Sequence, residues 1–187
     1  MCCGMATGCV NPTTESSVRS VEAAVVEVDC AQAGQVIKSF GTMFRVTPNV
    51  VLGAYHPVAD CVPEYPQGVT VAGKWATVVN TIPSKDLVYL SSMGRAVARV
   101  RTEPLRVGEP VTMVGTPQDS GFLEVRGRVL RTGMVLNEGK ERIVRGTAEV
   151  SGVCVPGMSG GPVVDSSGRV AGVILAVTNH STWVMPV

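Results

Sequence analysis

Short apolar runs alternate with turn residues along most of this chain. The runs are rich in β-branched residues, and glycine, proline or short polar stretches separate many of them. No segment keeps the 3.6-residue period of an amphipathic helix over three turns. The pattern predicts strands over residues 23–28, 43–46, 50–54, 69–72, 77–81, 87–90, 111–114, 123–130, 143–150, 170–177 and 182–185. This many short strands indicate an all-β protein, either a sandwich or a pair of barrels.

The polar and apolar segments also suggest where the chain divides. Residues 1–20 are polar and aperiodic, which predicts a flexible N-terminal arm. The polar stretch from Arg99 to Arg106 separates two blocks of similar strand content. We therefore expect one β-domain over residues 21–100 and a second over 101–187. A cleft between two such domains is the expected place for binding and chemistry.

Composition narrows the class of protein. The 187 residues are 45% hydrophobic and 17% charged, with a formal net charge of +1 and no long run of one sign. This balance gives no electrostatic case for a nucleic acid or an anionic membrane as partner. No stretch approaches the ~20 apolar residues of a spanning helix, and no complete secretory signal is visible. The sequence thus predicts a cytoplasmic protein, in a host cell if it is viral.

The six cysteines are unevenly placed. Cys2, Cys3 and Cys9 lie within the first nine residues, followed by Cys30, Cys61 and Cys154. Their spacing does not match the paired ligands of a zinc site, and neither histidine lies near the first three in sequence. Free thiols in a reducing compartment are the favoured interpretation, and no metal or cofactor is expected.

The segment Pro156-Gly157-Met158-Ser159-Gly160-Gly161-Pro162 carries the strongest chemical signal. A serine flanked this closely by glycines lies on a tight turn, where backbone amides can face an incoming oxygen. A plain glycine-rich turn is the alternative.

This string is similar to the GxSGGP signature of the trypsin/chymotrypsin superfamily. Residues 163–173 resemble the strand, turn and strand that follow this serine in the Deg/HtrA-type branch. Residues 41–58 resemble the segment that presents its histidine, and residues 85–90 resemble the strand that bears its aspartate. Segments 105–117 and 183–187 resemble the first and the closing strands of the second barrel. The resemblance implies two six-stranded antiparallel β-barrels with the active site between them.

Carried over residue by residue, the resemblance implies a triad of His56, Asp86 and Ser159, in the chain order that this fold uses. A nucleophilic serine needs a base of near-neutral pKa, and the chain has only two histidines, of which His180 lies in a polar turn. Asp60 is also between His56 and Ser159, but is expected to face away from the cleft. We expect Asp60, Asp119 and Asp165 to be surface turn residues.

The resemblance also implies the oxyanion donors and the substrate contacts. The backbone N–H groups of Gly157 and Ser159 would bind the oxyanion, and Met158 replaces the aspartate that digestive relatives use for activation. One wall of the primary pocket is expected from Val153, Cys154 and Val155, and the strand that pairs with the substrate backbone from Leu175, Ala176 and Val177. None of these pocket residues is a carboxylate, so the pocket would prefer a small aliphatic residue before the scissile bond. The alternative is that both segments are core strands of the barrel and that loops shape the pocket.

The sequence therefore predicts a serine endopeptidase that acts on protein or peptide substrates through an acyl-enzyme. Two settings remain open. The missing disulfide framework favours a protease that processes a viral polyprotein, whereas the Deg/HtrA resemblance favours a stand-alone quality-control protease. A trypsin-fold binding module without activity is the alternative from another class. The oligomeric state is not predicted.

Overall fold

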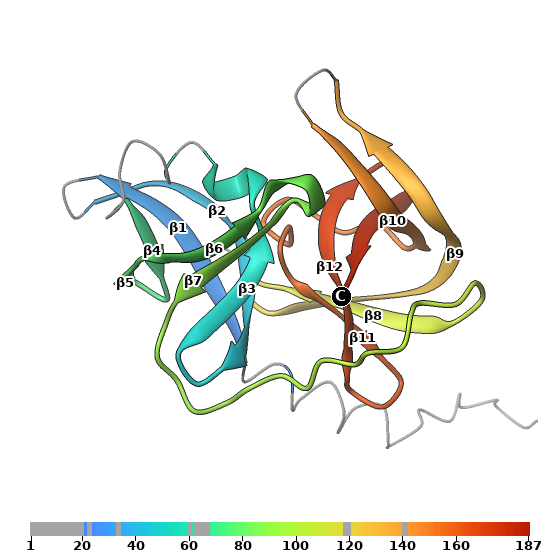
Figure 1. Ribbon diagram of the computed structural model, residues 1–187, viewed down its shortest axis with the longest axis horizontal. Coiled ribbons are helices and arrows are strands. Elements are labelled where there is room, and N and C mark those ends of the chain that lie inside the picture. Colours follow the sequence, from blue (N-terminus) through green and yellow to red (C-terminus); the bar gives the residue numbers. More distant parts are fainter. Residues whose placement is uncertain are drawn as a thin grey trace, which may run out of the picture.

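The fold consists almost entirely of antiparallel β-strands arranged in two halves (Figure 1). A computed structural model of the protein describes residues 21, 24–32, 35–59, 61, 68–117, 121–139 and 142–187, with side chains from residue 41 onward and at a few earlier positions. The predicted arm, residues 1–20, lies outside this part. None of the helices described is long and apolar enough to cross a membrane.

The N-terminal half is one seven-stranded sheet with the order β5-β4-β1-β2-β3-β7-β6. Its strands are β1 (Val25–Gln32), β2 (Gln35–Thr47), β3 (Val50–Ala54), β4 (Val69–Val71), β5 (Lys74–Ala76), β6 (Val78–Ile82) and β7 (Leu87–Ser91). Two single-turn 3-10 helices interrupt it, η1 (His56–Val58) after β3 and η2 (Pro83–Lys85) before β7. Each helix follows the end of a strand, and His56 of η1 and Pro83 of η2 line a pocket together with Arg142 of the other half.

The C-terminal half is a closed six-stranded barrel with the order β10-β13-β12-β11-β8-β9. Its strands are β8 (Pro110–Gly115), β9 (Leu123–Asn137), β10 (Ile143–Ser151), β11 (Pro162–Asp165), β12 (Val170–Val177) and β13 (Ser181–Pro186). The predicted all-β class and paired-barrel architecture are confirmed. Among the residues that the structure describes, the first half has seven strands rather than six, because Lys74–Ala76 forms a short strand beside β4.

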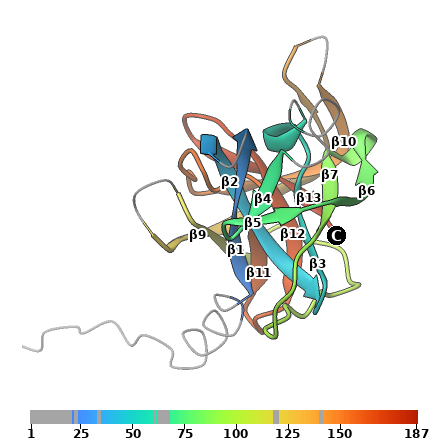
Figure 2. The same ribbon diagram turned by 90° about the vertical axis from the view of Figure 1, so that its left-hand side faces the viewer.

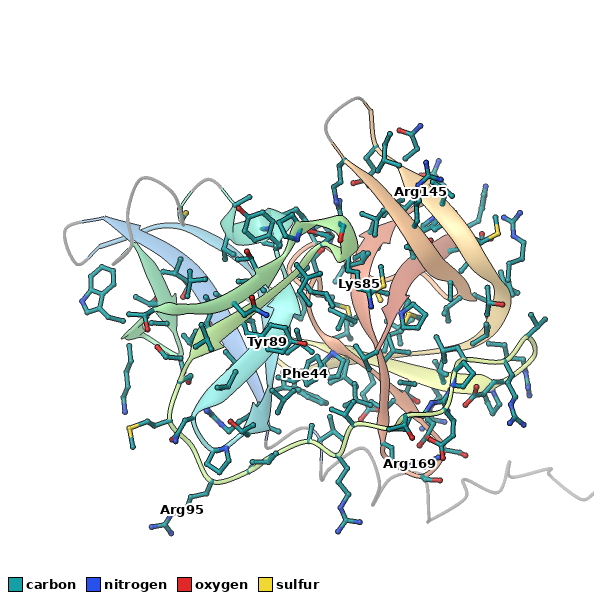
Figure 3. All side chains as sticks on the ribbon, in the orientation of Figure 1. Phe44, Lys85, Tyr89, Arg95, Arg145 and Arg169 are labelled. Carbon is teal, nitrogen blue, oxygen red and sulfur yellow. The ribbon has the colours of Figure 1, made fainter. Side chains whose placement is uncertain are left out.

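Each half has its own apolar interior, and a third cluster joins them. Met43, Val51 and Leu90 are buried inside the first half, and Met113, Val150 and Ile174 inside the second. The third cluster combines side chains from both halves; among its members are Phe44, Leu52, Leu87, Val114, Val173 and Leu175. Burial of this apolar surface holds the halves together, and Figure 3 shows Phe44 and Tyr89 directed from the first half toward the second.

The segment between the halves, residues 92–109, runs along one side of the molecule and contacts both (Figures 1 and 2). Ala98 donates its N–H to the carbonyl of Arg45 in the first half. Arg101 and Val170 are joined by an N–H to carbonyl bond of 2.9 Å in the second. This segment includes the predicted boundary, and it is fixed to both halves by backbone hydrogen bonds.

The expectation of free thiols is wrong at one position. Cys61 is disulfide-bonded, whereas Cys154 is a free, buried thiol. The N-terminal cysteines at positions 2, 3 and 9 lie outside the described residues.

Candidate active site

Asp86 is held in an unusual backbone conformation at the end of η2. Its φ of 54° and ψ of 44° lie in the left-handed region, which non-glycine residues seldom adopt. Pro83 starts the turn, and the N–H of Asp86 donates to the Pro83 carbonyl. Such conformations persist where the surroundings fix them, often at functional sites. Here the turn places a buried carboxylate against the loop that follows β3.

Three hydrogen bonds join that loop to Asp86. The N–H of Tyr55 donates to the Asp86 carbonyl at 2.9 Å, and the N–H of His56 donates to Asp86 Oδ1 at 2.8 Å. The His56 ring nitrogen Nδ1 lies 2.7 Å from Asp86 Oδ2. This bond fixes the ring and leaves Nε2 for other chemistry, the arrangement of a base oriented by a carboxylate.

Asp86 is ionised in spite of its burial. Desolvation by burial raises the pKa of this carboxyl, but the hydrogen bonds from His56 and the positive charges of His56 and Arg142 outweigh it, so its pKa lies below the ordinary value. Arg142 Nη2 is 2.5 Å from Asp86 Oδ2. The carboxylate can therefore stabilise a protonated imidazole without taking up the proton itself.

Ser159 lies on the turn between β10 and β11. Gly157 and Gly160 flank it with φ values of +92° and +86°, a region in which glycine avoids the Cβ clash of other residues. The turn is fixed by N–H to carbonyl bonds from Met158 to Val155 and from Gly160 to Ile174. The sequence thus encodes a rigid turn that holds the serine at the junction of the halves.

This turn packs directly against the first half. The Ser159 carbonyl accepts the N–H of Thr42 at 2.9 Å. A Cβ atom placed on Gly160 would lie 2.2 Å from the Thr42 carbonyl oxygen and 2.9 Å from the backbone nitrogen of Ala54. Ala54 is the last residue of β3, two positions before His56. Ser159 and His56, 103 positions apart by subtraction of their residue numbers, are therefore carried by backbone segments in close contact.

Two amide groups on the serine turn are free to bind an oxygen. Within the part of the chain that the structure describes, the N–H groups of Gly157 and Ser159 donate to no protein acceptor. Buried or half-buried amides normally find a partner, so these two N–H groups are available to an acceptor from outside the protein. No hydrogen bond joins the His56 ring to the Ser159 hydroxyl among these residues, and such bonds are commonly long before substrate binds.

The predicted pocket residues divide into exposed and buried positions. Val153, Val155 and Val177 are each about two-fifths exposed, at 43%, 40% and 42%. Cys154 is buried, and its N–H donates to Thr182 Oγ1 at 3.1 Å. Leu175 and Ala176 are also buried.

One edge of β12 is open beyond its pairing with β11. β12 pairs with β11 only as far as Val173, so its edge from Leu175 onward has no paired strand there within the described residues.

One of the aspartate predictions is wrong. Asp165 is buried rather than on the surface, because its carboxylate accepts backbone N–H groups of Ser167 and Arg169 and pairs with the buried side chain of Arg101. The turn is as predicted, but the ion pairs draw the carboxylate inward. Asp60 and Asp119 lie outside the described residues, and His180 is exposed as expected.

Two residues at the site were not singled out from the sequence. Thr42 bridges β2 and the serine turn: its hydroxyl donates to the Gly157 carbonyl at 2.8 Å and accepts the N–H of Thr116 at 2.9 Å. Arg142 reaches Asp86 from the other half of the protein. The family resemblance included Thr42 without assigning it a role, and no local pattern around Arg142 indicates its partner.

Comparisons with known proteins give a family match and similar solved structures. The family model described as trypsin-like peptidase domain matches residues 41–173. The active form of the Rv3671c protease from M. tuberculosis has 26% sequence identity and a TM-score of 0.76, covering 91% of this chain and 78% of that one. Comparison with curated protein sequences gives no match.

More distant solved structures share the fold. Deg5 is 18% identical with a TM-score of 0.76, covering 94% of this chain and 89% of that one. The HtrA-type protease AlgW with a decapeptide is 18% identical with a TM-score of 0.74, covering 95% of this chain and 64% of that one. The matched family model spans more than half of the chain and includes all three candidate triad positions. The chain therefore belongs to the trypsin-like peptidase family of serine proteases.

Proposed function

We propose that this protein is a serine endopeptidase in which Ser159 attacks the scissile carbonyl, His56 takes up its proton and Asp86 orients His56. The observation that carries the proposal is the pair of hydrogen bonds from His56 to the two oxygens of Asp86, at 2.8 and 2.7 Å. They hold the imidazole by its Nδ1 side just after β3, whose last residue, Ala54, lies close to Gly160 of the serine turn. The N–H groups of Gly157 and Ser159 would stabilise the tetrahedral oxyanion.

The covalent steps follow from these groups. The Ser159 oxygen forms a bond to the carbonyl carbon while His56 accepts the hydroxyl proton. Collapse of the tetrahedral intermediate breaks the C–N bond, and His56 returns the proton to the leaving amine. Water then attacks the acyl-enzyme with His56 again as base, which releases the acid and restores the serine.

Covalent labelling tests this assignment directly. A fluorophosphonate probe should modify Ser159, as mapped by mass spectrometry, and the Ser159→Ala variant should remain unlabelled and lose turnover by several orders of magnitude. Ser166, an exposed turn serine, provides the matched control, because Ser166→Ala should label and cleave normally. An unlabelled, correctly folded wild-type protein would instead support a binding module.

For substrates, we propose a preference for a small aliphatic residue before the scissile bond. The partly exposed Val153 and Val155 support it, since the 153–155 segment offers apolar surface and no carboxylate for a basic side chain. A peptide library varied at that position should give higher kcat/KM for valine and alanine than for lysine. Equal or faster cleavage after lysine would contradict this preference.

The biological setting is a separate proposal. The HtrA-type and Deg structures that resemble this chain support a stand-alone protease of that type more than the processing of a viral polyprotein. The cytoplasmic location also stays a prediction, and the disulfide at Cys61 weighs against it, because disulfides persist mainly in oxidising compartments. Fractionation of the native source with thiol mapping of Cys61 would decide the location.

A further inference from the structure

The β9–β10 hairpin extends from the C-terminal barrel at the upper right of Figure 1. Arg142 directly precedes β10, and β10 contacts the η2 turn that carries Lys85 and leads to Asp86. In Figure 3 the Lys85 turn lies between the two halves, while Arg145, further along β10, points away from it. The hairpin thus brings one arginine of the second half to the aspartate of the first.

The guanidinium of Arg142 makes contacts in three directions. Its Nη2 donates to Asp86 Oδ2 at 2.5 Å and to the Leu175 carbonyl on β12 at 3.1 Å. Its Nη1 pairs with Glu138, four residues earlier on the same hairpin. The side chain is 19% exposed, so water screens these contacts only in part. One nitrogen therefore connects the aspartate to the strand proposed to pair with substrate.

Asp86 and His56 share their charge environment with this arginine. Asp86 Oδ2 accepts from both His56 Nδ1 and Arg142 Nη2. Among the described residues, the charged groups acting on Asp86 are His56 and Arg142, and those paired with Arg142 are Asp86 and Glu138. Because the carboxylate side chain is only 4% exposed, the protein supplies most of its hydrogen bonding. Arg142 is the donor to it from the second half.

We propose that Arg142 is a positioning residue of the catalytic centre, which holds the Asp86 carboxylate from the opposite half and tunes the protonation of His56. This inference rests on the proposed function, because it assigns Arg142 to the same triad. A charge-assisted bond from a planar guanidinium fixes the carboxylate plane. Its positive charge opposes the uptake of a proton by the neighbouring imidazole, so loss of Arg142 should favour the protonated form of His56.

Arg142 also connects the two halves of the protein at Asp86. Arg142 is held by Leu175 on β12 and by Glu138 on its own hairpin, so a displacement of either element would move the donor on Asp86. Arg142 also lines a pocket of about 280 Å³ together with Tyr55, His56 and Asp86. The geometry of the hairpin and the state of the triad are therefore linked through one side chain.

An NMR titration tests the proposal without relying on activity. The protein has two histidines, so in a Ser159→Ala background the imidazole signals of His56 and His180 can be followed together, with exposed His180 as internal reference. Arg142→Ala should move the His56 titration curve to higher pH by about one pH unit, and the His180 curve should not move. Arg142→Lys, which keeps the charge, should leave the His56 curve near that of its parent.

Two further variants separate positioning from a general effect on the fold. Arg145→Ala removes an exposed arginine from the same strand and should change neither curve. Glu138→Gln removes one anchor of Arg142 but keeps its charge, and should shift the His56 curve less than Arg142→Ala does. If Arg142→Ala does not fold, Glu138→Gln still decides. A role for Arg142 requires a shift of the His56 curve in Glu138→Gln that neither Arg142→Lys nor Arg145→Ala produces.

Kinetics in the Ser159 protein provide the second measurement. Arg142→Ala should lower kcat by about tenfold, which equals about 1.4 kcal/mol, with a smaller change in KM, and the acidic limb of the rate profile should move to higher pH. An unchanged His56 curve, or a higher kcat/KM in Arg142→Ala, would overturn the proposal. Arg142 would then only occupy the Leu175 carbonyl on the strand expected to pair with substrate. If wild type failed to label or cleave while the His56 curve shifted as expected, the proposed function would fail and the link between Arg142 and His56 would stand.

Discussion

The hydroxyl of Thr42 connects the two halves at the serine turn, and its removal should be costly. Thr42 is 1% exposed, donates to the Gly157 carbonyl and accepts the N–H of Thr116. Thr42→Val keeps the shape of the side chain but leaves both backbone groups without this partner. Both groups bond to the same side-chain oxygen, so the methyl groups of valine cannot replace it.

The structure sets the size of the effect. Each buried polar group left unpaired costs about 1–3 kcal/mol. Two such groups, with partial compensation by water, give an expected loss of about 3 kcal/mol in the free energy of unfolding. For a protein of this length, that corresponds to a fall in Tm of about 6–12 °C.

Urea unfolding and peptide hydrolysis measure the two consequences. Thr42→Ser keeps the hydroxyl and loses one methyl group, so it should cost only about 1 kcal/mol. Thr42→Val should also lower kcat by about tenfold, since the Gly157 carbonyl that it frees belongs to the turn that carries the proposed oxyanion donors. A Thr42→Val protein as stable as Thr42→Ser would refute this reasoning, because volume rather than hydrogen bonding would then control the position.

Three other changes have defined outcomes. Gly160→Ala should destabilise the fold by about 3 kcal/mol or more, because its Cβ would overlap two backbone atoms. The control is Gly73→Ala, which is also at positive φ but has open space around it and should cost only about 1–2 kcal/mol. The urea midpoints of the two variants measure this difference in stability. Burial raises the pKa of the Cys154 thiol to about 11. Iodoacetamide at pH 8, followed by peptide mapping, should therefore leave Cys154 unmodified in the native protein and modify it in urea. Rapid labelling of the native protein would contradict the burial of this thiol. Hydrogen bonds and ion pairs outweigh burial at Asp86 and Asp165 and hold the pKa values of these carboxyl groups below normal. The two ionised carboxylates therefore stabilise the folded protein above the unfolded pKa of about 4. This stability is lost as pH falls through the lower pKa values of the folded state. Urea midpoints should therefore drop between pH 5 and more acidic conditions, and Asp165→Asn should reduce that drop.

Much of the strand framework could be predicted because the valine-rich runs match the pleat. β3 and β12 have the bounds that the apolar pattern predicts, and β7 is one residue longer. β5 was missed because Lys74–Ala76 is short and has two exposed residues. β9 continues to Asn137, past the point where Gly133 interrupts the apolar pattern. Pairing with neighbouring strands, rather than local residue preference, forms β5 and extends β9.

The site could be predicted where residues carry a motif and not where contacts are distant in sequence. The glycines around Ser159 and the strand end before His56 are local features. Arg142 and Asp86 are 56 positions apart, and the burial of Asp165 depends on Arg101, 64 positions away. These two ion pairs form only when the chain is folded, so no local sequence pattern predicts them.

The apolar cluster shared by the two halves makes them thermodynamically dependent on each other. Phe44 and Leu87 of the first half belong to the same buried cluster as Val173 and Leu175 of the second. A half produced alone would present that face to water and would be prone to self-association. Unfolding should accordingly occur in one cooperative step. The residues at the junction therefore come together on folding and separate on unfolding in the same step. Peptidase activity should be lost at the same denaturant concentration as the fold of the whole molecule.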